Sequence, residues 1–195
     1  LAEVHLRGSK LHAFAQHAAE GRVVIATEAD PSGRSDKGTS GGVAILPKTH
    51  LEVTLLNGTV QSQGCWSCKE DTAFLTGVQI NLRQELQIQV LSSYHLDEPA
   101  LEILAATHKR TSGGALPFVL LGDFDLDQKL FEDEFGEWLR GLKAQTMGSG
   151  QATCSLGQRL ELDFAIVSTQ IAHLVEFDKP DWSVPFGPHA GLSLR

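Results

Sequence analysis

The sequence predicts an α/β sandwich built around a mixed β-sheet system. Three observations lead to this class. Short apolar, β-branched runs recur along the chain, most of them are bounded by Gly, Pro, Asn or charged residues, and helix-like segments lie between them. With 195 residues and 42% apolar content the chain can bury one substantial core, so we expect a single domain over residues 1–195.

Eight of these runs are predicted to form strands. Several alternate apolar and polar residues, as LQIQV does, which is typical of antiparallel strands with one solvated face or of two packed sheets. The runs are RVVIAT (22–27), GGVAIL (41–46), LEVTLL (51–56), AFLTGVQI (73–80), LQIQVLSS (86–93), PFVLL (117–121), ELDFAIVS (161–168) and HLVEF (173–177).

Three segments are predicted to form helices, at residues 9–21, 97–110 and 125–144. In the first, Ser9 is a candidate N-cap and Gly21 a candidate terminator. The third carries an apolar stripe that we expect to pack in the core rather than to hold a cofactor. This stripe consists of Leu130, Phe131, Phe135, Trp138, Leu139 and Leu142.

Charge, composition and cysteine content narrow the classes of protein to which this sequence can belong. A net charge of −8 argues against a broad basic groove for nucleic acid, although a local one stays open. No apolar run approaches the roughly 18 residues of a membrane helix, so we expect no membrane span. Cys65 and Cys68 lack a second cysteine pair, which leaves both a metal site and two ordinary thiols open. The sequence opens on Leu1 rather than Met and indicates no compartment.

Acidic residues gather where a buried strand ends, in the stretch PFVLLGDFDLDQ. Asp127 precedes a predicted helix and is expected to cap it. Asp123 and Asp125 directly follow the apolar run, and Asp163 interrupts another apolar run. A carboxylate in such a place loses hydration unless it binds a cation or accepts hydrogen bonds. Asp123 and Asp163 are therefore the first candidates for a site that handles metal or phosphate.

Six stretches occur in an order that resembles the endonuclease/exonuclease/phosphatase superfamily, which includes apurinic endonucleases, pancreatic-type DNases and non-LTR retroelement endonucleases. They are LAEVHL, SGGVAIL, SSYHLDE, VLLGDFDLD, ELDFAIVS and GPHAGLSL, and they are distributed across nearly the whole length of the chain. The resemblance is closest to the retroelement branch. It implies a DNase I-like, four-layered α/β sandwich with two packed mixed sheets, here without the first strand and helix.

The resemblance also implies a metal and phosphate site. Glu3 in LAEV matches the metal-binding Glu of the family, and Tyr94 matches a Tyr that contacts phosphate. Asp163 matches the Asp of an RIDY-like strand, which supports the metal or the attacking water. The implied cofactor is Mg²⁺ or Mn²⁺, since hard cations prefer oxygen ligands.

The remaining matches supply the groups expected to act on the phosphodiester. Asp123, from the GDFN-like motif, would orient or deprotonate the water, and Asp125 stands at the position of the motif's Asn. His189, from the SDH-like motif, would donate to a phosphate oxygen. Orienting water and stabilising charge on the phosphate are the tasks of such a site.

Three departures from the family pattern keep a second interpretation open. The chain starts almost at Glu3, Pro188 replaces the Asp of SDH, and Asp125 replaces an Asn. The first hypothesis is a Mg²⁺-dependent phosphodiesterase, a DNA endonuclease of the retroelement type with nucleic acid as its partner. The alternative is a catalytically degenerate domain that acts as a structural or binding subunit, with its sheet completed by another protein chain or by its own preceding segment.

Overall fold

The structure of the protein is a computed structural model. It describes residues 5–18, 20–26, 28–31, 39–40, 42–55, 66–67, 74–83, 86–94, 115–156, 160–183 and 188–195. Within these ranges no helix has the length and apolar character needed to cross a membrane.

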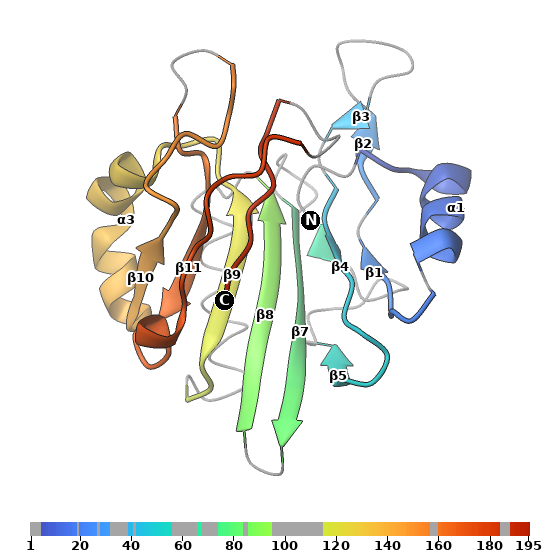
Figure 1. The fold of residues 1–195 in the computed structure, drawn as a ribbon, viewed down its shortest axis with the longest axis horizontal. Helices are drawn as coiled ribbons and strands as arrows, with labels where there is room; N and C mark the ends of the chain where they lie inside the picture. The colour runs from blue at the N-terminus through green and yellow to red at the C-terminus, as the bar shows by residue number, and fades with distance from the viewer. Residues whose placement is uncertain are drawn as a thin grey trace.

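A seven-stranded mixed sheet forms the centre of the molecule (Figure 1). Its strands follow the order β10-β11-β9-β8-β7-β5, with β6 paired to β7 beside this path. The pairing of β8 with β9 is parallel and the other pairings are antiparallel. The strands are β5 (Glu52–Leu55), β6 (Trp66–Ser67), β7 (Phe74–Arg83), β8 (Leu86–Tyr94), β9 (Phe118–Asp123), β10 (Ala144–Met147) and β11 (Asp163–Ser168).

The parallel pair determines where the site lies. Parallel strands end at the same edge of a sheet, and loops beyond that edge are where α/β proteins place ligands. Tyr94 at the end of β8 is in register with Asp123 at the end of β9. Since β11 runs antiparallel to β9, its first residue, Asp163, lies at this edge as well, opposite Asp123.

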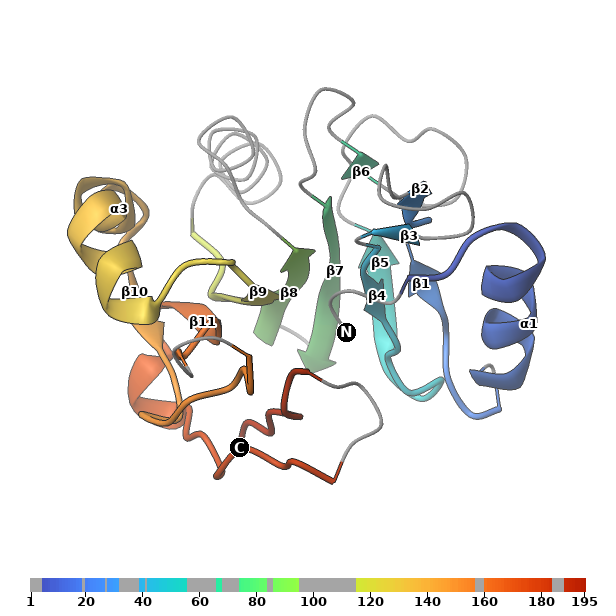
Figure 2. The same cartoon turned by 90° about the horizontal axis from the view of Figure 1, so that it is seen from above.

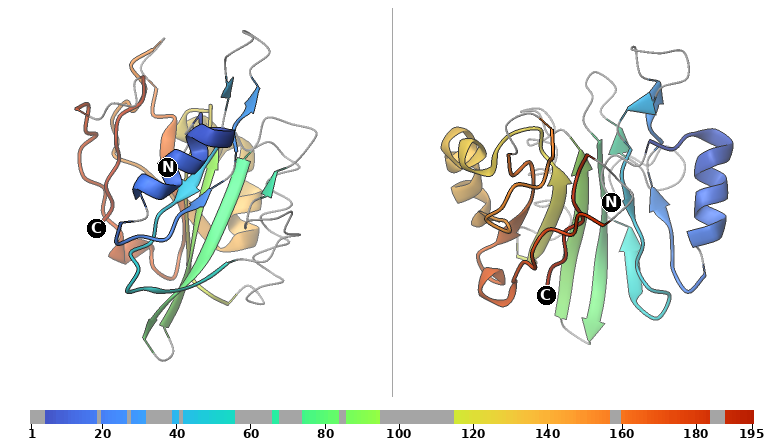
Figure 3. Two further views of the ribbon diagram at one scale, coloured as in Figure 1. Left: turned by 90° about the vertical axis from the view of Figure 1, so that its right-hand side faces the viewer. Right: turned by 45° about the horizontal axis from the view of Figure 1, so that its top comes forward.

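The two faces of β9 and β11 bury different partners because side chains alternate along a strand. Leu120 and Ile166 share a core with Phe131 and Leu139 of helix α3 (Gln128–Leu142). The opposite face carries Val119, Leu121, Ala165 and Val167, which pack under residues 171–177 and Leu194. Figures 2 and 3 show α3 and the carboxyl-terminal segment in different layers of the molecule. The side chains of Asp123 and Asp163 project from this same face, since they follow the alternation of Leu121 and Ala165.

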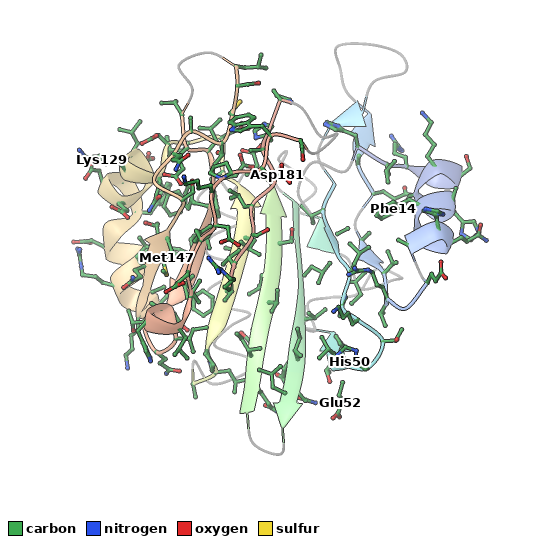
Figure 4. All side chains as sticks on the ribbon, in the orientation of Figure 1. Phe14, His50, Glu52, Lys129, Met147 and Asp181 are labelled. Atoms are coloured by element: carbon green, nitrogen blue, oxygen red, sulfur yellow. The ribbon has the colours of Figure 1, made fainter. Side chains whose placement is uncertain are left out.

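Two small sheets and helix α1 (Gly8–Ala18) lie at the other end of the molecule (Figure 1). The pair β1 (Ile25–Ala26) with β4 (Ala44–Ile45) and the pair β2 (Asp30–Pro31) with β3 (Thr39–Ser40) are both antiparallel. Helix α1 buries none of its described side chains fully, and Phe14 on it is only half-buried (Figure 4). A mixed sheet, further small sheets and few helices confirm the predicted α/β class.

Most of the predicted elements are present, and three details were wrong. HLVEF contains the 3₁₀ turn η1 (Ala172–Leu174) and a single bridge from Phe177 to Leu194 instead of a strand. Strand β10 was not predicted, since AQTM has no apolar run and is stabilised by pairing with β11. Leu130 is 54% exposed, whereas the rest of the predicted stripe packs in the core. The predicted helix at 97–110 and the pair Cys65 and Cys68 lie outside the described residues.

Candidate active site

The sheet register brings Asp123 and Asp163 together. Phe124 donates its amide N–H to the Leu162 carbonyl at 3.0 Å. In an antiparallel ladder this makes the neighbouring Asp163–Asp123 pair a non-hydrogen-bonded one, the type in which side chains approach most closely. Two acids that stand 40 positions apart in the sequence therefore share one small region of the sheet edge.

His189 completes this group from the carboxyl-terminal segment. Its backbone forms a bridge with Cys154 on one side, while Gly191, two residues on, pairs with Asp181 on the other. Asp181, labelled in Figure 4, exchanges two backbone hydrogen bonds with Gly191, at 2.8 and 2.9 Å. The segment carrying the imidazole is thus fixed by backbone bonds on both of its edges.

The imidazole of His189 lies between the two carboxylates. Its Nδ1 is 2.8 Å from Oδ2 of Asp163, and its Nε2 is 3.5 Å from Oδ2 of Asp123. The side chains are 17%, 15% and 3% exposed for His189, Asp163 and Asp123. Charge interactions are only weakly screened at such exposure, so each group strongly affects the others.

The partner of Nδ1 corrects one inference from the sequence. The replacement of the Asp of SDH by Pro188 predicts that His189 has no carboxylate to hold its imidazole in a useful orientation. The structure shows that Asp163 takes this position, because its Oδ2 faces Nδ1. The signal was present in the sequence as an Asp inside an apolar strand, but it was interpreted as support for metal or water.

Burial strongly perturbs Asp123. Loss of hydration, followed by repulsion from Asp163, raises the pKa of Asp123 from 3.8 to about 7, against smaller lowering effects of His189 and the Asp125 N–H. A carboxyl whose pKa lies near neutrality can take up or release a proton during a reaction.

Asp125 belongs to the turn that follows β9 rather than to the group of three. Its backbone has a φ of 52°, a left-handed conformation that Asn, Asp and Gly adopt most readily. Its N–H donates to Oδ1 of Asp123 at 3.1 Å, and its side chain is exposed. Asp127, next along the chain, accepts from the Lys129 N–H at 3.1 Å and caps α3, as predicted.

The two remaining predicted residues are described only in part or not at all. The backbone of Tyr94 lies beside Asp123 in the β8–β9 register, which agrees with a position at the site edge, but its side chain lies outside the described residues. Glu3 lies outside them as well. Their roles stay predictions.

The donor set fits a hard divalent cation. One ligand atom from each of Asp123, Asp163 and His189 can be chosen so that all lie within 4.8 Å of one another. Both ring nitrogens of His189 face carboxylates, which leaves the carboxylate oxygens as the natural ligands. Oxygen ligands are those that Mg²⁺ and Mn²⁺ prefer, and a cation would also relieve the repulsion that raises the pKa of Asp123.

Comparison by sequence finds no matching protein family and no matching curated protein. Comparison of structures does find similar proteins. The endonuclease domain of TRAS1, a telomere-specific non-LTR retrotransposon, aligns with a TM-score of 0.58 over 95% of this chain and 90% of that domain, at 14% identity. An endonuclease/exonuclease/phosphatase protein from Bacteroides vulgatus aligns with a TM-score of 0.55 over 98% and 83%, at 13% identity. The chain has the DNase I-like fold.

Other DNase I-like structures agree with this assignment. The human Nocturnin catalytic domain aligns with a TM-score of 0.54, at 13% identity, over 92% of this chain and 74% of that one. The superfamily resemblance noted in the sequence is thereby confirmed for the fold. Identities this low concern the fold alone, so the functions of individual side chains have to be argued from the geometry of this chain.

Proposed function

We propose that this DNase I-like chain is a divalent-cation-dependent phosphodiesterase that cleaves nucleic acid. The observation that carries the proposal is the placement of one imidazole between two carboxylates at the end of the parallel strand pair. Phosphodiester hydrolysis needs a group that orients water, a donor to the phosphate and a means to neutralise charge. The three side chains offer all of these within one small volume.

Each side chain has a distinct role in this proposal. Asp163 accepts the Nδ1–H of His189 and so fixes the tautomer and the orientation of the ring. Nε2, on the side of Asp123, carries a proton as well when the ring is an imidazolium, and in that form it donates to a phosphate oxygen. Asp123 orients the attacking water and accepts its proton.

The cation would be held by the carboxylates of Asp123 and Asp163, with Glu3 as a further predicted ligand. When bound, Mg²⁺ or Mn²⁺ neutralises negative charge on the phosphate oxygens. This matters for a chain of net charge −8, because substrate phosphates would otherwise meet an acidic site.

The finer assignment is a DNA endonuclease of the retroelement type. The alignment with the TRAS1 endonuclease domain over nearly the full length of both chains supports it. A TDP2 from D. rerio, described in complex with a single-stranded DNA product, aligns with a TM-score of 0.50 and adds support for nucleic acid as substrate.

A nicking assay tests the proposal. Purified protein is incubated with supercoiled plasmid and with single-stranded DNA and RNA, in the presence of Mg²⁺, Mn²⁺ or a chelator. We expect cleavage that the chelator stops and that Asp123→Ala and His189→Ala reduce by at least about a hundredfold. Asp133→Asn, an exposed acid on α3, is the matched control and should cleave like the wild type.

The same assay decides between the two hypotheses from the sequence. Absence of cleavage on all substrates, together with a stable complex with another chain, would support the degenerate domain acting as a structural or binding subunit. Cleavage that persists in Asp123→Ala would exclude the proposed site even if the protein is a nuclease.

A further inference from the structure

The Asp163–His189 pair depends on two segments that are not neighbours in the sequence, and one fully buried residue is bonded to both. This residue is Thr153, which is fully buried with 0% of its surface exposed. It lies in the segment 148–156, between the end of β10 and the start of β11. Buried hydroxyl groups are costly unless they are hydrogen-bonded, so the bonds of Thr153 indicate what it holds.

The hydroxyl of Thr153 receives two backbone donors at the start of β11. The N–H of Leu162 reaches Oγ1 at 3.0 Å, and the N–H of Asp163 reaches it at 2.9 Å. The backbone of Thr153 contacts the other segment, since its carbonyl accepts from the Ala190 N–H at 2.8 Å. Thr153 is thus bonded directly to Asp163 and to the residue that follows His189.

The sheet explains why a hydroxyl is needed at this point. Strand β10 ends at Met147, opposite Ala165, so the beginning of β11 extends beyond its neighbour on that side. Because Asp163 and Asp123 form a non-hydrogen-bonded pair, the N–H of Asp163 points away from β9 toward this missing neighbour. Thr153 supplies the acceptor that a longer β10 would have provided.

A second bond extends the effect to Asp123. Leu162 donates its N–H to Thr153 Oγ1, and its carbonyl accepts from the Phe124 N–H. This one residue therefore joins Thr153 to the end of β9, where Asp123 stands. The segments that carry all three members of the site are thus linked to Thr153, those of Asp163 and Asp123 through its hydroxyl and that of His189 through its backbone carbonyl.

We propose that Thr153 is a positioning residue that sets the alignment of Asp163 with the imidazole of His189. This inference deepens the proposed function and rests on it for its consequence in catalysis. Thr153 contacts no reacting group itself, so its effect on cleavage passes through the carboxylate–imidazole pair. Loss of such an orienting partner typically reduces activity by about 10- to 100-fold.

Two substitutions separate the hydroxyl from the shape of the side chain. Thr153→Val keeps the volume and removes the acceptor, whereas Thr153→Ser keeps the hydroxyl. Long-range ¹H–¹⁵N spectra of the His189 ring, taken where the imidazole is neutral, report which nitrogen carries the proton. We expect an Nδ1–H tautomer in the wild type and in Thr153→Ser, and a mixture with Nε2–H in Thr153→Val. Where the Val variant does not fold, Thr153→Cys, with its weaker acceptor, takes its place.

Kinetics test whether the effect passes through the pair. Thr153→Val should lower kcat/KM by about 10- to 100-fold, with Thr153→Ser within about threefold of the wild type. In a protein that already carries Asp163→Asn, Thr153→Val should lower kcat/KM by less than about threefold, because the carboxylate–imidazole pair is already broken.

The proposal would be overturned if folded Thr153→Val kept the tautomer of the wild type. It would also be overturned if the losses in kcat/KM from Thr153→Val and Asp163→Asn multiplied in the double variant. Thr153 would then be a purely structural residue. If the wild type cleaves no substrate, the proposed function fails separately. The ring spectra then still decide whether Thr153 positions the pair.

Discussion

The buried carboxyl of Asp123 should make the stability of this protein depend on pH in a way that one substitution removes. Its folded-state pKa is raised from 3.8 to about 7, so the folded chain retains a proton that the unfolded chain releases. The stability that this proton contributes is fully present below pH 3.8 and is lost as the pH rises through about 7. Asp123→Asn has no such proton and should lack this dependence.

The magnitude follows from the two pKa values. They differ by about 3, and one pKa unit corresponds to about 1.4 kcal/mol, which gives a full effect of roughly 4 kcal/mol. Between about pH 5 and about pH 8 the titration accounts for most of this, roughly 3 kcal/mol. As the pH rises over this interval, the free energy of unfolding of the wild type should therefore fall by about that much relative to that of Asp123→Asn. Its amide oxygen can still accept from the Asp125 N–H, as the carboxylate does.

Urea unfolding of both proteins, in the presence of a chelator, measures the difference at each pH. Asp181→Asn is the control. Hydrogen bonds from Ser183 lower the pKa of Asp181, whereas that of Asp123 is raised, so Asp181 titrates below this pH interval. Its difference from the wild type should stay constant. Adding Mg²⁺ should stabilise the wild type more than Asp123→Asn, since a cation favours the ionised carboxylate.

The reasoning would be refuted if the free energy of unfolding differed between wild type and Asp123→Asn by the same amount at about pH 5 and at about pH 8, within about 0.5 kcal/mol. It would mean that Asp123 titrates near its ordinary pKa and is therefore hydrated or paired in the folded protein. The raised pKa that burial and Asp163 impose on Asp123 would then be absent from the folded protein.

Three further substitutions have defined outcomes. Asp163→Asn should lower kcat/KM by at least about a hundredfold, because an amide no longer selects the Nδ1–H tautomer, and single-turnover cleavage rates would show it. Phe164→Ala should lower the free energy of unfolding by about 3–5 kcal/mol, since the ring is fully buried and stacks on Phe124 at 4.2 Å between centroids, as urea unfolding would show. Asp127→Ala should cost about 1 kcal/mol through loss of the α3 cap, measured in the same way, with cleavage retained.

Local patterns in the sequence predicted much of the fold and the main acids of the site. An apolar run that ends on Gly122 and Asp123 predicts a buried strand with a polar end, and β9 has that form. An Asp inside ELDFAIVS predicts a carboxylate with a special partner, which His189 provides. Both signals are local, because they depend on hydrophobic periodicity and on the cost of burying charge.

What the sequence could not predict depends on contacts between distant segments. Strand β10 exists because Ala144–Met147 pairs with β11, and its own residues favour no strand. The bond between Thr153 and Asp163 follows from where β10 stops, a boundary that no pattern marks. The choice of Asp163 rather than a neighbour of His189 as the partner of Nδ1 is likewise a result of sheet register.

The parallel pairing of β8 with β9 also determines when the site can form during folding. Strands β7 and β8 are neighbours in the sequence and can pair early, whereas β8 and β9 pair across a longer stretch of sequence, from Tyr94 to Phe118, which costs more loop entropy. Asp163 and His189 can be aligned only on a β9 that is already docked. The repulsion between Asp123 and Asp163 therefore arises only once β9 and β11 have paired, when the core that these strands share is present to offset it.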